Sequence, residues 1–204
     1  MACLYRSDLS KNLTSVLVQD AEDAKKIGKS ISDFKENAKA NLKGDAYNAG
    51  IDQLTIFIDA MNKRAQVMDT LVGAINDAMS SLNDYMGEYD VLDDGKLGEL
   101  RETIARTEVF INDIRGKLYT LNLNYKEGID DPKNKKLLNY DALNILKEQE
   151  ALLQKFKIYE DKLENLAPTV ETAYNKFVGS VNSTLSSYES MVNNISIAEV
   201  IETV

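Results

Sequence analysis

The sequence Leu42-Lys43-Gly44-Asp45-Ala46-Tyr47 separates two long stretches in which apolar residues recur every three or four positions. Before it, the apolar or small residues are Leu9, Leu13, Val16, Ala24, Ile27, Ile31, Phe34 and Ala38. After it, they are Tyr47, Ile51, Leu54, Ile58, Met61, Ala65, Met68, Val72, Ile75, Met79, Leu82, Met86 and Tyr89. The second series alternates steps of four and three, the a/d spacing of a heptad repeat, and predicts a long helix docked along partner helices.

The glycine between the two stretches predicts a hairpin. Gly44 can take the left-handed conformation that closes a helix, since it has no side chain to clash. Asp45 can then cap the next helix by accepting hydrogen bonds from its free amides. We therefore predict a helical hairpin over residues 7–90, with helices over about 8–42 and 46–89 and with Ser7 as the first N-cap.

The rest of the chain continues the helical pattern. Sparse glycine, two prolines and missing strand punctuation favour an all-α fold, an elongated helical hairpin or bundle, in one domain over 1–204. Further helices are predicted over 96–127, 141–166 and 168–196. The segment before the second of these has Pro132, which suits the first position of a short helix capped by Asp131. Pro168 either starts the last helix or kinks one continuous helix.

The predicted seams of these later helices also step by three and four. In the helix over 96–127 the seam residues are Leu97, Leu100, Ile104, Thr107, Ile111, Ile114, Leu118, Leu121 and Tyr125. In the next helix they are Ala142, Ile145, Leu152, Phe156, Tyr159, Leu163 and Leu166. In the last they are Val170, Tyr174, Phe177, Val181, Leu185, Tyr188, Met191 and Ile195.

Composition argues against several functional classes. The chain has 204 residues and no histidine, which removes imidazole bases and nearly every zinc, copper or haem site, so no metal and no cofactor is expected. Its one cysteine, Cys3, cannot form an intrachain disulfide. A net charge of −9 opposes binding to nucleic acid, and no apolar run approaches a membrane span. The first residues have no apolar core of a Sec signal, so any export would use another route.

One face of the helix over 46–89 is rich in methionine, notably Met61 and Met68. Methionine adapts to irregular surfaces and is common where partners dock. A second apolar row consists of Ile56, Phe57, Leu71 and Ala78. Together they form a stripe too wide for one neighbouring helix. The additional neighbours are either later helices of this chain or helices of separate proteins.

The hairpin around Leu42-Lys43-Gly44 resembles the WXG100 family of small helical hairpins, and more closely the LXG domain that opens type VII secreted toxins of Gram-positive bacteria. In that family a signal of the form Tyr-x-x-x-Asp/Glu follows the second helix, and Tyr89 with Asp93 matches its spacing. The resemblance implies an N-terminal targeting domain that binds WXG100-like partners and is recruited to the secretion machinery. Leu42, Gly44, Met61 and Met68 would then belong to the turn and the partner-binding surface.

The resemblance also implies a toxic domain used in competition between bacteria, expected beyond Val204, where the sequence lacks a clear helix stop. The chain itself is then not an enzyme. It is made in the cytoplasm and secreted by the Sec-independent type VII route. The alternative is a generic coiled-coil scaffold or self-associating rod, which would share the seam but need no turn signature and no different partner. A helical pore-forming toxin would need a long apolar tip, which the sequence lacks.

Overall fold

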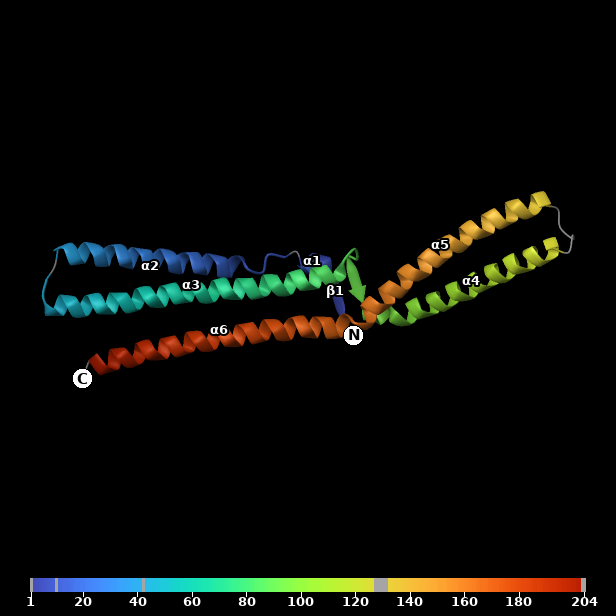
Figure 1. Cartoon of the computed structure of the whole chain (residues 1–204). Coiled ribbons are helices and arrows are strands. Elements are labelled where there is room, and N and C mark those ends of the chain that lie inside the picture. Colours follow the sequence, from blue (N-terminus) through green and yellow to red (C-terminus); the bar gives the residue numbers. More distant parts are fainter. Residues whose placement is uncertain (1, 10, 42, 127–131, 203–204) are drawn as a thin grey trace. The chain divides into compact units, whose positions relative to one another are not determined.

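The computed structural model describes residues 2–9, 11–41, 43–126 and 132–202 (Figure 1). These residues are helical apart from one pair of short strands and the connecting turns, which confirms the predicted all-α class. The elements are β1 (Cys3–Tyr5), α1 (Arg6–Leu9), α2 (Ser15–Asn41), α3 (Asp45–Met86), β2 (Val91–Asp93), the 3-10 helix η1 (Asp94–Lys96), α4 (Leu97–Lys126), α5 (Pro132–Glu164) and α6 (Leu166–Glu202). The chain forms two compact units, one of Met1–Tyr5 with Tyr89–Thr169 and one of Arg6–Glu88 with Val170–Val204.

Helices α2 and α3 form an antiparallel hairpin in the second unit (Figure 1). The heptad seam of α3 is confirmed: Ile51, Ala65 and Met86 are buried, and the other described seam side chains are half-buried. At 1.5 Å per residue this helix is about 63 Å long, and apolar residues line its whole length.

The interior face of α2 differs from the predicted seam. Its buried residues are all small, namely Ala21, Ala24, Gly28 and Ala38. A Cβ on Gly28 would lie 3.4 Å from the Cβ of Met61, so the two backbones approach closely there. The larger predicted seam residues Leu13, Val16, Ile27 and Phe34 are exposed. Small side chains line the seam because they allow α2 and α3 to pack at short range. The larger apolar side chains of α2 therefore lie on the exposed side of the helix.

The N-terminal helix is interrupted. Ser7 lies inside the short α1 and is not an N-cap, and α2 starts only at Ser15. The Asn12 side chain accepts hydrogen bonds from the Thr14 amide at 3.3 Å and the Thr14 hydroxyl at 3.1 Å. Such local side-chain bonds compete with helical ones and explain the break.

Gly44 occupies the N-cap position of α3, and Asp45 is the first helical residue, so the predicted Asp45 cap is wrong. The predicted positive φ is confirmed, with Gly44 at φ 129° and ψ 164°. This is a mirror-extended conformation open essentially to glycine, and not the left-handed helical one that we expected. Leu42 lies outside the described residues.

Helix α6 covers part of the second apolar row of α3, which the sequence left to either this chain or a separate protein. Ala74 and Ala78 of α3 and Ala173 and Phe177 of α6 line one small cavity, which places the two helices side by side (Figure 1). A helix of the same chain therefore covers the row at Ala78, while Phe57 stays exposed.

A two-stranded antiparallel sheet, which the sequence pattern did not predict, lies at the base of the first unit. Leu4 of β1 pairs with Leu92 of β2, and both are buried. Because the strands are three residues each and far apart in sequence, neither has an alternation long enough to detect. The predicted turn over 89–95 is thus a strand and a 3-10 helix, and α3 ends at Met86, where Gly87 is the C-cap with a positive φ of 62°.

Of the remaining helices, α4 agrees with the prediction, whereas α5 and α6 both start earlier than predicted. Helix α4 matches closely, but α5 begins at Pro132 as one long helix. Proline suits this first position, whereas the predicted cap Asp131 lies outside the described residues. Pro168 lies in the first turn of a separate α6, because the α-helix is interrupted at Asn165. Leu163 and Leu166 on either side of the break are fully buried.

The predicted α5 seam is confirmed at Ala142, Phe156, Tyr159 and Leu163, which are buried or half-buried. It is wrong at Ile145 and Leu152, which are exposed, while Leu146, Gln149 and Leu153 are half-buried in their place. On α6, Tyr174 and Leu185 are likewise exposed.

We expect Gly44→Val to lower the free energy of unfolding by about 1–3 kcal/mol, since a β-branched residue is strained at this φ. Urea unfolding of the variant and wild type measures this. Gly73→Val is the control, because Gly73 is helical and a Cβ added there would meet no atom within 4 Å, so the change should be neutral or stabilising. An unchanged midpoint for Gly44→Val would contradict the assigned backbone.

The close contact at Gly28 leads to a second prediction. Gly28→Leu must push α2 away from Met61 and should cost about 1–3 kcal/mol of stability. Gly73→Leu, at an open helical position, should cost nothing. Equal melting temperatures for the two variants would show that the helices are not in close contact at Gly28.

Candidate helix-docking surfaces

An exposed apolar row follows α2 beside the hairpin seam. Val16, Ile27 and Phe34 are 77%, 49% and 61% exposed. Their separations of eleven and seven residues place them on one face of the helix. We call these three residues the α2 row. Exposed apolar rows of this kind are typical of surfaces that another helix covers.

An ion pair shows which flank of the hairpin carries the α2 row. Asp20 lies seven residues before Ile27, on the same side of α2, and its carboxylate accepts a hydrogen bond from Arg64 Nη2 of α3 at 2.5 Å. This hydrogen bond raises the pKa of Arg64, and the attraction to the Asp20 charge adds to it. Both side chains are partly exposed, so the pair contributes little to stability and mainly sets the register of α2 against α3.

Helix α6 borders the same flank. Tyr188 of α6 interacts electrostatically with Arg64, which also bonds Asp20. Leu185 lies one turn before Tyr188 and is 43% exposed. The flank of α3 that carries Arg64 therefore has exposed apolar side chains on both sides, from the α2 row and from α6.

The structure distributes the predicted partner-binding residues differently. Met61 packs at Gly28 inside the hairpin, and Met68 is half-buried along the same seam. Gly44 is exposed at the turn. The predicted docking methionines thus face their own chain, at least at Met61. The α2 row was hidden in the sequence because its residues have the spacing of a core seam.

Tyr89 and Asp93 both have structural roles. Tyr89 lies beyond the end of α3, and its ring stacks on Tyr159 of α5 with centroids 4.7 Å apart. Asp93 belongs to β2, and its carboxylate accepts a hydrogen bond from the Gly95 amide at 3.0 Å, which caps η1. The two residues of the proposed export signal do not share a helix face, and their role in export stays a prediction.

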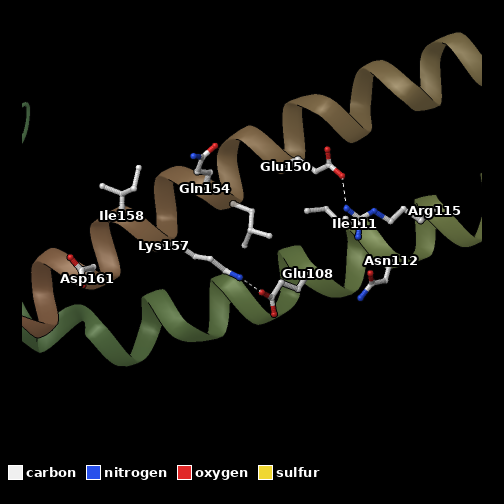
Figure 2. Close-up of a pocket in the computed structure, with 10 residues that line it drawn as sticks. Glu108, Ile111, Asn112, Arg115, Glu150, Gln154, Lys157, Ile158 and Asp161 are labelled. Carbon is white, nitrogen blue, oxygen red and sulfur yellow. Dashed lines mark hydrogen bonds and ion pairs between the residues drawn. The ribbon is translucent and has the colours of Figure 1, made fainter.

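An open groove of about 700 Å³ runs between α4 and α5, with Ile111 and Leu153 among its lining residues. Two ion pairs cross it, Arg115–Glu150 and Lys157–Glu108, each at 2.6 Å (Figure 2). These four charges neutralise one another in pairs and join the two helices in register.

Within the described ranges, no helix combines the length and apolar content that crossing a membrane requires. Over the same part of the chain, no three cysteine or carboxylate side chains gather closely enough to hold a metal ion. Comparison of the chain with protein-family models, with curated proteins and with solved structures returned no match.

The Tyr89–Tyr159 stack leads to a prediction about pH. Burial raises the pKa of Tyr159 above the ordinary value of 10.0, and the neighbouring Tyr89 and Asp93 add to this. The folded state therefore favours the neutral phenol of Tyr159. The stabilisation of the fold that this gives is complete below pH 10 and is lost as the pH rises through the higher pKa of the folded state. We expect Tyr159→Phe to flatten the alkaline loss of stability.

Unfolding midpoints of wild type and Tyr159→Phe across the alkaline range measure this effect. Tyr119→Phe is the matched control, since Tyr119 is 67% exposed on α4. Parallel curves for wild type and Tyr159→Phe would contradict the assigned environment.

Proposed function

We propose that this chain is a targeting domain of a type VII secreted bacterial toxin and acts by binding small WXG100-like helical hairpins. The observation that carries the proposal is the α2 row, an exposed apolar face on a hairpin that turns at a Leu-x-Gly sequence. Partner helices would bury this face, and the resulting complex would be recruited for Sec-independent export. The chain then contributes no catalysis of its own.

The surface that we propose for docking is the α2 row, and not the methionine seam. A helix laid along the flank of Arg64 would contact the α2 row on one side and Leu185 of α6 on the other. With α2, α3 and α6 it would complete a four-helix arrangement. This geometry suits the helix-in-groove mode, in which an amphipathic helix buries its apolar face between others.

We expect the double change Ile27→Glu with Phe34→Glu to abolish co-purification with small helical proteins encoded beside the gene. Both side chains are exposed, so helicity by circular dichroism should be unchanged. Val18→Glu is the control on the same helix, because Val18 lies about 200° around from Val16 and should not affect binding. Full binding by the folded double variant would contradict docking on this row.

The double change Met61→Glu with Met68→Glu separates docking from core packing. Met61 lies against Gly28, so two glutamates in the seam should unfold the hairpin by burying unpaired charge. A variant that stays helical and loses only its partner would instead place the docking surface on the seam.

A further inference from the structure

The α4–α5 hairpin has two flanks of different character. On one, Glu108 pairs with Lys157, Arg115 pairs with Glu150, and Arg101 pairs with Glu164. We call this side the ion-paired flank (Figure 2). Its pairs also define the register, since each joins residues at the same height on two antiparallel helices.

The opposite side carries apolar side chains. Phe110 lies two residues after Glu108, and Leu152 lies two residues after Glu150. Two residues correspond to a rotation of about 200° around a helix. Phe110 and Leu152 therefore point away from the ion-paired flank. They are 47% and 38% exposed, and Ile145, one heptad before Leu152, is 43% exposed. We call this side the apolar flank.

One end of the apolar flank is already covered within the unit. Tyr159 lies one heptad after Leu152, so it shares the same face of α5. The ring of Tyr89 stacks on it, and the Tyr159 hydroxyl donates to the Val91 carbonyl of β2 at 3.4 Å. Further along the same face, Leu152 and Ile145 are exposed.

We propose that the apolar flank binds the apolar flank of a second copy of this chain. In this dimer a two-fold axis parallel to the helices places α4 of each copy on α5 of the other, as an antiparallel four-helix bundle.

The charges at the rim of the flank favour this occupant. Lys117 lies two residues after Arg115, and Glu148 lies two residues before Glu150, so both are turned away from the ion-paired flank. Because Arg115 and Glu150 are paired in antiparallel helices, Lys117 and Glu148 lie at the same height. The two-fold axis preserves height, so Lys117 of each copy faces Glu148 of the other, and one complementary pair occurs twice. Lys117 also pairs with Asp113 of its own helix at 2.7 Å, so in the dimer it would be shared between two carboxylates.

The apolar residues match in the same way. Phe110 lies at the height of Lys155, because Glu108 pairs with Lys157, and Leu152 is within one turn of that level. Phe110 of one copy would thus reach Leu152 of the other. The exposed apolar residues run from the level of Phe110 to that of Ile145, ten residues or about 15 Å along the helices. Two helices about 10 Å wide then give a footprint of about 300 Å² per copy. A total of about 600 Å² is below that of stable specific interfaces and implies a weak, concentration-dependent dimer.

Sedimentation equilibrium of the full chain over a range of concentrations tests the proposal. We expect a monomer–dimer equilibrium for wild type and loss of the dimer in the double variant Phe110→Glu with Leu152→Glu. Circular dichroism checks that this variant stays helical, as its exposed positions predict. Val109→Glu is the matched control: Val109 is 69% exposed and adjacent in sequence, but about 100° further around α4 from the flank, so the dimer should persist.

A charge exchange tests the geometry independently of folding. Lys117→Glu and Glu148→Lys should each raise the dimer Kd about two- to tenfold, because each removes two exposed ion pairs and places like charges together. The combination of both changes should restore most of the affinity, and the remaining loss should reflect repulsion between the new carboxylate and Asp113, one turn away on α4. A chain that is monomeric throughout, or a dimer that ignores both sets of changes, would overturn the proposal.

These outcomes are separate from those of the targeting proposal, because the α2 row and the apolar flank belong to different units. Loss of dimer with partner binding retained would support the dimer surface alone.

Discussion

A seam between two helices can bury only a narrow stripe, and this constraint shapes both units of the structure. In the α2–α3 hairpin the stripe is filled from α2 by alanine and glycine, which bring the helices together at Gly28 and Met61. In the α4–α5 hairpin it is filled by Ile104, Ile111 and Leu118 of α4. Apolar side chains that do not fit into either stripe are left on the flanks.

The exposed apolar residues on the two hairpins have different surroundings. Those of α2 lie beside the Asp20–Arg64 pair, on a flank that α6 borders through Tyr188. Those of α4 and α5 lie opposite a ladder of interhelical ion pairs, on a flank whose base is closed by Tyr89. The first surface is the one that we propose for partner docking, and the second is the one that we propose for self-association.

The small sheet and the capping groups connect residues distant in sequence. Asp94 accepts from the Ala2 amide at 2.8 Å, and Arg6 donates to Asn83 at 2.7 Å near the end of α3. Tyr89 and Asp93, which match the spacing of an export signal, contribute to stacking and capping instead of projecting from a helix. These structural roles do not test the export signal, which stays a prediction.

The sequence by itself determined the all-α class, the hairpin break at Gly44, the seam of α3 and the extent of α4, because heptad spacing and glycine conformation are local properties. It could not decide which of two apolar stripes on α2 or α5 faces inward. Spacing is the same for Ile27 or Ile145 whether the side chain is buried or exposed, and the choice depends on how closely the neighbouring helix approaches. The tertiary structure alone decided it: small residues at Ala24 and Gly28 permit close packing on α2, and the buried seam of α4, such as Ile111 and Leu118, determines which face of α5 packs inward. The pairing of β1 with β2 was likewise decided by the tertiary structure, since two strands of three residues are too short to show an alternating pattern in the sequence.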